Sequence, residues 1–145
     1  MFETMPWTTI VIAAVLMFAV IATWVLVQHR TNPTWGTIDE PDATAYVKGS
    51  CGDAMKISLR FRDGRVVDAK YWTDGCRMSN ECGAAAARLA FDKRPEELMD
   101  VSHIAIEREV GSLPEEDRHC ATLAAGALHE CVKIFVLTSD EADLG

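Results

Sequence analysis

Residues 51–76, CGDAMKISLRFRDGRVVDAKYWTDGC, decide the fold of this chain. Apolar and polar side chains alternate through residues 54–62, and they alternate again through residues 65–73. A period of two is typical of a strand with one buried face, and the Asp63-Gly64 pair between the two runs marks a hairpin turn. The stretch therefore predicts an antiparallel β-hairpin whose inward-facing residues are Met55, Ile57, Leu59, Phe61, Val67, Ala69 and Tyr71.

The register of this hairpin must place both apolar sets on one face. A two-residue turn at Asp63-Gly64 sets Leu59 opposite Asp68, which puts the apolar residues of the return strand on the opposite face of the sheet from Leu59. A shift of one residue in either direction sets Leu59 opposite Val67 or Ala69 instead. We therefore predict a bulged hairpin with a turn longer than two residues.

Both ends of the hairpin carry groups that can bind a metal. In either shifted register Cys76 lies within one residue of the position opposite Cys51, so the two sulfurs should be roughly 5 to 8 Å apart. Asp53 lies next to them in the sequence. Two thiols and one carboxylate are thus expected at the open end of one rigid element.

The N-terminal segment predicts a membrane anchor. Residues 7–28 contain no charged side chain, and a helix of this length crosses ~30 Å of hydrocarbon. A secretory signal peptide is the alternative, but it would begin with basic residues, whereas this chain begins MFETMP. Glu3 before the run and Arg30 after it favour a single-pass protein with the N-terminus outside and the C-terminal domain in the cytoplasm.

Composition narrows the classes of partner. The chain has 145 residues, enough for one modest domain after the anchor, and a formal net charge of −8. This charge argues against nucleic acid and anionic lipid surfaces as partners. There are five cysteines, and a cytoplasmic domain would keep them reduced. Metal or sulfur chemistry is therefore the favoured use of the thiols.

The rest of the chain completes one domain. Residues 31–45 read as an extended connector after the anchor of residues 1–30, and residues 45–50 add a third strand to the hairpin. Helices are predicted at residues 79–91, 95–99, 104–110 and, from an apolar stripe, 120–134. We expect the metal-binding domain to cover residues 46–138 and an acidic tail to cover residues 139–145.

The last helix supplies a third thiol. Cys120 heads its apolar stripe, where helix N-terminal amides are expected to lower the pKa of the thiol. Cys51, Cys76 and Cys120, with Asp53 or His119 as the fourth ligand, form a set suited to iron, an iron–sulfur cluster or zinc. The two remaining thiols, Cys82 and Cys131, are expected to be small packing residues.

With these residues in view, the sequence resembles the U-type iron–sulfur cluster scaffold family, that is, IscU and the N-terminal domain of NifU. The matching segments run in order from residue 32 to residue 130. They are Asn32-Pro33 with Gly36, residues 49–55, Asp63-Gly64 with Asp68-Ala69, Gly75-Cys76 with Ser79, Leu113-Pro114, and His119-Cys120-Ala121 with Leu123-Ala124 and Ala127-Leu128.

The resemblance implies an α+β fold in which helices pack on a three-stranded antiparallel sheet, here preceded by one transmembrane helix. It places Cys51, Asp53, Cys76, His119 and Cys120 on the family's site positions and implies a [2Fe-2S] cluster, or alternatively zinc or iron. It implies a cysteine desulfurase and apo iron–sulfur acceptors as partners. By the same comparison Cys120 is the expected persulfide acceptor, and no catalytic activity is expected.

Two departures from the family affect the function. A membrane span replaces the usual N-terminal helix. The chaperone-recognition sequence Leu-Pro-Pro-Val-Lys is replaced by residues 113–117, LPEED, which argues against chaperone docking.

Two functions follow from this sequence. The first is a membrane-anchored scaffold or carrier that assembles or holds a [2Fe-2S] cluster. The alternative is a non-catalytic accessory subunit of a membrane redox complex, with a fixed cluster or a structural zinc. A thiol–disulfide redox enzyme is disfavoured because the chain has no C-x-x-C motif.

Overall fold

The computed structural model describes residues 7–30 and 34–145, with the side chains of residues 27–30 left out. The chain divides into two compact units, Met1–Pro33 and Thr34–Gly145, which are considered separately. Glu3, on which the predicted orientation partly rests, and Asn32-Pro33 of the family resemblance lie outside the described residues.

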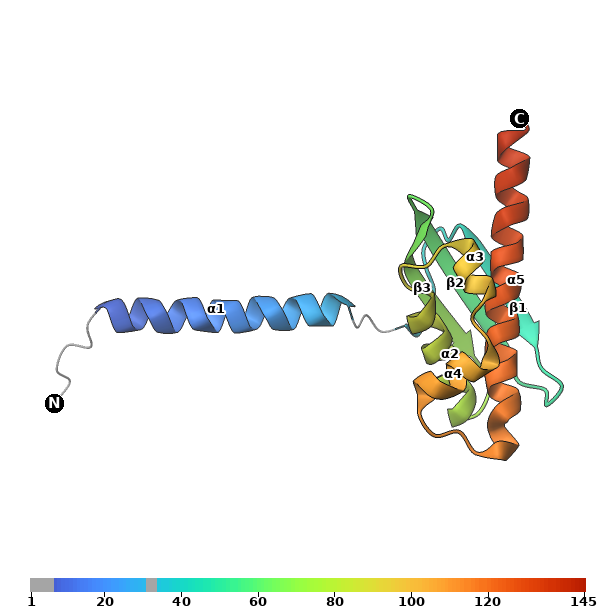
Figure 1. The fold of residues 1–145 in the computed structure, drawn as a ribbon, viewed down its shortest axis with the longest axis horizontal. Coiled ribbons are helices and arrows are strands. Elements are labelled where there is room, and N and C mark those ends of the chain that lie inside the picture. Colours follow the sequence, from blue (N-terminus) through green and yellow to red (C-terminus); the bar gives the residue numbers. More distant parts are fainter. Residues whose placement is uncertain (1–6, 31–33) are drawn as a thin grey trace. The chain divides into compact units, whose positions relative to one another are not determined.

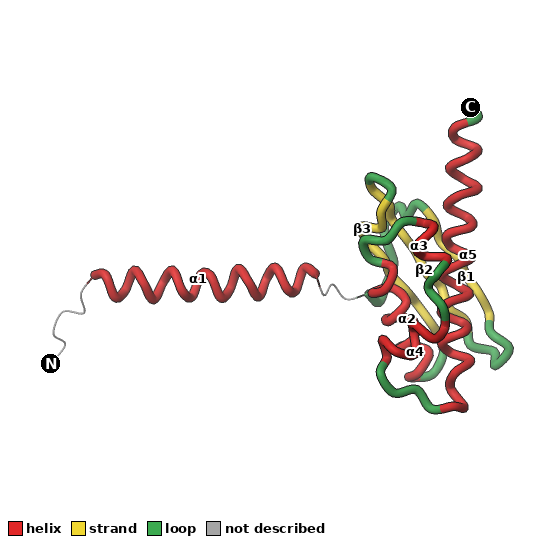
Figure 2. The backbone as a smooth tube through the Cα atoms, in the orientation of Figure 1, coloured by secondary structure: helices red, strands yellow, loops and turns green. Residues whose placement is uncertain are grey.

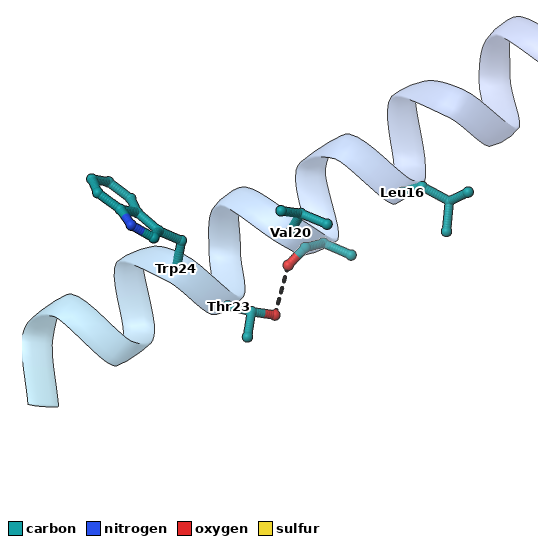
Figure 3. Close-up of a pocket in the computed structure, with 5 residues that line it drawn as sticks. Leu16, Val20, Thr23 and Trp24 are labelled. Atoms are coloured by element: carbon teal, nitrogen blue, oxygen red, sulfur yellow. Dashed lines mark hydrogen bonds between the residues drawn. The ribbon is translucent and has the colours of Figure 1, made fainter.

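The first unit contains one long apolar helix, α1 (Trp7–Arg30) (Figures 1 and 2). Its hydropathy averages 2.6 over Trp7–Leu26, and no part of this window is buried. The hydroxyl of Thr23 donates a hydrogen bond to the carbonyl oxygen of Ala19 at 2.7 Å, so it is satisfied within the helix (Figure 3). By length and composition α1 is able to cross a membrane. The same criterion also admits Glu115–Asp143, but half of that window is buried in the protein core.

The second unit is built on a three-stranded antiparallel sheet in the order β1-β2-β3. The strands are β1 (Ala43–Lys48), β2 (Ala54–Arg62) and β3 (Arg65–Thr73). The predicted three-stranded sheet is confirmed, with β1 beginning two residues earlier than expected. The open edge of β3 is partly covered because the backbone N–H of Gly36 donates to the carbonyl oxygen of Tyr71 at 2.9 Å.

The hairpin between β2 and β3 combines a tight turn with a bulge in the strand. Asp63 and Gly64 both have positive φ angles, 54° and 74°, as a two-residue type I′ turn requires. The register then shifts by one residue, and beyond the shift Leu59 pairs with Ala69, one of the two partners predicted. The prediction of a longer turn was wrong, because the extra residue is Val67 in β3. Val67 was expected to face inward but is 40% exposed.

Helices cover one face of the sheet (Figure 1). α5 packs on β1 and β2, α2 packs on β3, and α2 and α5 contact each other. α2 begins two residues earlier than predicted, and α5 continues through most of residues 139–145. The helices are α2 (Arg77–Ala90), α3 (Pro95–Met99), α4 (His103–Val110), the 3₁₀ turn η1 (Glu115–Asp117) and α5 (Arg118–Asp143).

The core lies between the sheet and the two long helices. Met55, Ile57 and Leu59 of β2 are fully buried, as the alternation predicted. Gly83 of α2 lies directly on the ring of Tyr71, where a Cβ atom would overlap the ring carbons. The small residues of α2 and α5 therefore allow both helices to approach the sheet closely. They include Ala85, Ala86, Ala90, Ala121, Ala124 and Ala127.

Candidate metal centre

Three connections of the second unit carry the candidate ligands. Gly49–Asp53 joins β1 to β2, residues 74–76 join β3 to α2, and η1 leads into the first turn of α5. The antiparallel arrangement places the first two connections at the same end of the sheet, because β1 ends, β2 begins and β3 ends there. The packing of α5 against β1 and β2 brings the third connection to them.

Ser79, in the first turn of α2, links these connections. Its hydroxyl donates to Oδ2 of Asp53 at 2.8 Å, and it lies 3.4 Å from Sγ of Cys120 and 3.7 Å from Sγ of Cys76. Ser79 is fully buried. Because a hydroxyl has one proton, it donates to only one of these three groups at a time. Ser79 is one of the residues that carry the family resemblance, but its position between two cysteines and a carboxylate depends on the tertiary fold.

Gly75 makes room for the Asp53 carboxylate. A Cβ atom on Gly75 would lie 2.5 Å from Oδ2 of Asp53 and 2.7 Å from Oγ of Ser79. The carboxylate also accepts a hydrogen bond from the backbone N–H of Cys76 at 3.4 Å. A negative group is favoured here because the N-terminus of α2 carries a partial positive charge. Asp53 is thus fixed beside Cys76, although its ligand role stays a prediction.

The structure brings two of the predicted thiols together with an unexpected carboxylate. Sγ of Cys76, Sγ of Cys120 and a carboxylate oxygen of Asp117 all lie within 4.8 Å of one another. Asp117 was not among the predicted ligands. Its spacing of three residues from Cys120 is the available sequence signal, because residues three apart share a helical face. The family's site positions do not include Asp117, so the sequence did not predict it.

His119 presents a nitrogen to the same site. Its Nδ1 lies 2.8 Å from the carbonyl oxygen of Glu116, and its Nε2 lies 3.5 Å from Sγ of Cys120. A carbonyl oxygen only accepts, so Nδ1 must carry the proton. In the neutral ring Nε2 is then an acceptor, the form that binds a metal. The structure therefore places His119 next to Cys120, outside the group of three ligand atoms.

Cys51 is exposed and does not belong to the group of three ligand atoms within the described residues. It lies in the connection between β1 and β2, beside Gly52, whose φ angle is +96°. A pocket of about 240 Å³ adjoins this connection and is lined by Lys48, Gly49, Ser50 and His119, together with Val47, Thr122, Leu123 and Gly126. The site therefore has open space between the β1–β2 connection and His119.

The two neighbouring thiols differ in acidity. The backbone N–H of Ser79 is the main cause that lowers the pKa of Cys76, which is exposed. Burial raises the pKa of Cys120 to about 11, and the hydrogen bond from Ser79 offsets this only in part. The expectation that helix amides lower the pKa of Cys120 was therefore wrong, because the cost of burying a thiolate exceeds their effect.

The other two cysteines are packing residues, as expected. Cys82 in α2 and Cys131 in α5 are fully buried, and burial raises the pKa of each thiol to about 12. Neither belongs to the group of three ligand atoms. Both therefore act as small apolar side chains.

The sequence of this chain is similar to those of known iron–sulfur cluster assembly proteins. A family described as "NifU-like N terminal domain" matches residues 22–141. The chain is 33% identical over 117 residues to "Iron-sulfur cluster assembly scaffold protein IscU 1" of Archaeoglobus fulgidus, covering 79% of this chain and 76% of that protein. It is 29% identical over 124 residues to "Iron-sulfur cluster assembly protein 3" of Arabidopsis thaliana, covering 81% of this chain and 72% of the relative.

Solved structures agree with this assignment. A crystal structure of the N-terminal part of a NifU-like protein from Brucella abortus superposes with a TM-score of 0.54 at 25% identity, covering 74% of this chain and 89% of the other. A putative iron–sulfur cluster assembly scaffold protein from Fervidobacterium islandicum has the same fold, with a TM-score of 0.57 at 18% identity, covering 73% and 92% of the two chains. Sequence and fold together show that this chain belongs to the family of NifU-like N-terminal domains.

Proposed function

We propose that this protein is a membrane-tethered scaffold that assembles or carries an iron–sulfur cluster. The observation that carries the proposal is the meeting of the Cys76 and Cys120 thiols with carboxylate groups at one end of a NifU-like fold. Thiolates are the usual ligands of such clusters. The curated relatives are named as cluster assembly proteins, so the expected role is that of a non-catalytic scaffold rather than an enzyme.

The cluster is the cargo of this scaffold, and we propose [2Fe-2S] as its type. Cys51, Cys76 and Cys120 would supply three thiolates, with Asp53 or His119 as the fourth ligand. A carboxylate or imidazole binds iron less firmly than a thiolate does, which suits a cluster that must later leave. Cys120 stays the predicted persulfide acceptor. Because Cys120 is fully buried, a sulfur donor would have to displace neighbouring atoms before reaching it.

The apolar helix α1 would hold the domain at a membrane. Its side chains from Trp7 to Leu26 are exposed and carry no charge, as a lipid-facing helix requires. We propose a single-pass arrangement with the C-terminal domain in the cytoplasm, where cysteine desulfurase and apo acceptors would be the partners. A tether raises the local concentration of the scaffold near membrane-bound acceptors.

A second function is favoured by α1 and by the acidic η1. An accessory subunit of a membrane redox complex would also need a span, and it would not need a chaperone-binding sequence. In that case the cluster, or a structural zinc, would stay bound.

One experiment separates the two functions. The full chain is purified anaerobically in detergent from its native membrane, its metal and sulfide are measured, and an apo-ferredoxin is added. Rapid transfer of a [2Fe-2S] cluster supports the scaffold, whereas a stoichiometric complex whose metal does not exchange would refute it. Replacing Cys51, Cys76 or Cys120 by Ala should abolish cluster binding, and Cys131→Ala is the matched control. A reporter that places the C-terminus outside would contradict the orientation.

A further inference from the structure

The C-terminal end of α5 projects beyond the sheet on which the rest of the helix packs (Figure 1). Phe135 is the last apolar residue of α5 that packs against the core, and its ring stacks on that of Phe61 in β2, with the two ring centroids 3.9 Å apart. The helix continues to Asp143. Val136 and Leu137, directly after Phe135, are 42% and 66% exposed. Two apolar side chains on this end of α5 therefore face solvent.

A hollow of about 350 Å³ lies between this end of α5 and the end of α3. It is lined by Met99, Val132, Lys133, Val136 and Leu137. Since four of these five residues are apolar, the hollow suits an apolar side chain. Asp140 lies one turn beyond Val136 on the same side of the helix. We call the five lining residues and Asp140 the α5 end face.

The charges at this end of α5 are not balanced within the chain. Asp140, Glu141 and Asp143 lie near the C-terminus of the helix, where the partial negative charge of the helix end disfavours carboxylates. Among residues 7–30 and 34–145, none of these three acids is in an ion pair. Lys133 pairs with Glu130 at 3.2 Å, but both side chains are exposed. Such a pair is weak, so Lys133 can exchange Glu130 for another carboxylate.

The α5 end face is complementary to itself. Val136 and Leu137 lie at its centre, Lys133 lies three residues before them and Asp140 lies three residues after them. Lys133 and Asp140 are seven residues apart, so they share one side of the helix. When two copies of α5 are aligned antiparallel about this centre, each Lys133 is opposite Asp140 of the second copy. Each Val136 is then opposite Leu137, as the two-fold contact of a symmetric dimer requires.

We propose that the α5 end face binds the same face of a second copy of this chain as an antiparallel helix pair. The two Lys133–Asp140 pairs would fix the direction and register of the helices, and the apolar side chains would fill the two hollows. The face has six residues, fewer than the ~20–30 residues on each side of a stable complex, so the dimer needs a high local concentration. A membrane tether would supply this concentration, and the inference rests on the proposed function in this respect alone.

This dimer would leave both candidate metal centres accessible. Cys120 lies in the first turn of α5, and Leu137 lies about 25 Å further along the helix at 1.5 Å per residue. The contact between the two copies is therefore at the opposite end of the helix from the thiol. Asp140→Lys should accordingly bind a cluster as the parent chain does.

Carbodiimide cross-linking in lipid vesicles tests the contact. Equal amounts of unlabelled and ¹⁵N-labelled full chain are reconstituted together in phosphatidylcholine vesicles. The reagent joins a lysine amine to a carboxylate that touches it. We expect a Lys133–Asp140 cross-link between one unlabelled and one labelled peptide, which mass spectrometry identifies. Cross-links found only within peptides of one isotope would overturn the proposal.

Charge reversal provides the sharper test. Lys133→Asp and Asp140→Lys each place like charges opposite one another twice, so each variant alone should self-associate at least about tenfold more weakly than the parent chain. An equal mixture of the two variants should recover the association, because lysine is again opposite aspartate at every pair. Energy transfer between fluorophores on N-terminal tags measures association in the same vesicles. Glu115→Lys is the matched control, because it reverses the charge of an exposed residue outside the α5 end face.

Three outcomes would overturn the proposal. They are a parent chain that stays monomeric in the vesicles, either variant alone associating as strongly as the parent, and a mixture that associates no better than its components. A dimer held by α1 would give the second outcome. Circular dichroism confirms that each variant is folded. The energy transfer does not depend on cluster transfer, so a chain that dimerises without passing on a cluster would refute the scaffold and keep this inference.

Discussion

Gly75→Ala probes the packing that fixes the Asp53 carboxylate. The new Cβ atom would lie 2.5 Å from Oδ2 of Asp53 and 2.7 Å from both Cβ and Oγ of Ser79, whereas real Cβ atoms almost never approach a neighbour within 3.0 Å. Because the contacts with Ser79 involve a fully buried side chain, they cannot all be relieved by a movement of Asp53 into solvent.

The cost of Gly75→Ala follows from two effects that overlap. Overpacking of a well-filled site costs about 1–3 kcal/mol. Displacement of Asp53 also breaks the 2.8 Å hydrogen bond from Ser79, and a bond to a charged group is worth about 1.5–3 kcal/mol. Since moving the carboxylate relieves part of the overlap, we expect a net loss of about 2 kcal/mol. This raises the unfolded fraction by about 30-fold.

Urea unfolding of the full chain in detergent measures this loss. Trp35 and Trp72 lie in the second unit and report its unfolding by fluorescence. A loss of about 2 kcal/mol lowers the midpoint by about 1 M urea. Gly126→Ala is the matched control, because nothing lies within 4 Å of its Cβ position and alanine favours the helix by about 0.5–1 kcal/mol. Equal stability of Gly75→Ala and the parent chain would refute the packing argument.

Three further predictions concern the same unit. The rate of Cys76 alkylation should have its pH midpoint below the ordinary thiol pKa of about 8.5, because the pKa of Cys76 is lowered. Cys120, with a pKa of about 11, should be alkylated more than about hundredfold more slowly than Cys76 near pH 7.5. Peptide mass spectrometry measures both rates, and equal rates would contradict the assigned burial. Gly83→Ala should cost about 1–3 kcal/mol by urea unfolding, because its Cβ overlaps the Tyr71 ring; an increase in stability would contradict this packing. Ser79→Ala should cost about 1–2 kcal/mol and leave Asp53 without its 2.8 Å donor; an unchanged midpoint would argue against the hydrogen bond.

The sheet and its buried face were predictable because they depend on local alternation. Met55, Ile57 and Leu59 recur with a period of two, and the structure buries all three. The position of the bulge was not predictable. An extra residue in the turn and an extra residue at Val67 both allow Leu59 to pair with Ala69, so the pairing does not distinguish them. The sequence pattern constrains the register of the paired residues but not the position of the residue that is left over.

The candidate site was predictable only in part. Cysteine identity and the family resemblance pointed to Cys76 and Cys120, which the structure places together. The positions of Asp117 and Ser79 beside the two thiols were not predicted, because both depend on how α5 and α2 dock on the sheet. The expected lowering of the Cys120 pKa was wrong for a related reason, since burial is a tertiary property that position along a helix does not reveal.

The contrast between an exposed Cys76 and a fully buried Cys120 gives the site an outside and an inside. If the proposed cluster binds here, the exposed thiols of Cys51 and Cys76 would contact it before the buried Cys120 does. The ligands of an acceptor protein would then replace the exposed thiols before they replace the buried one. In the proposed scaffold, handover would proceed by stepwise ligand exchange, and the buried Cys120 would be the last ligand to dissociate.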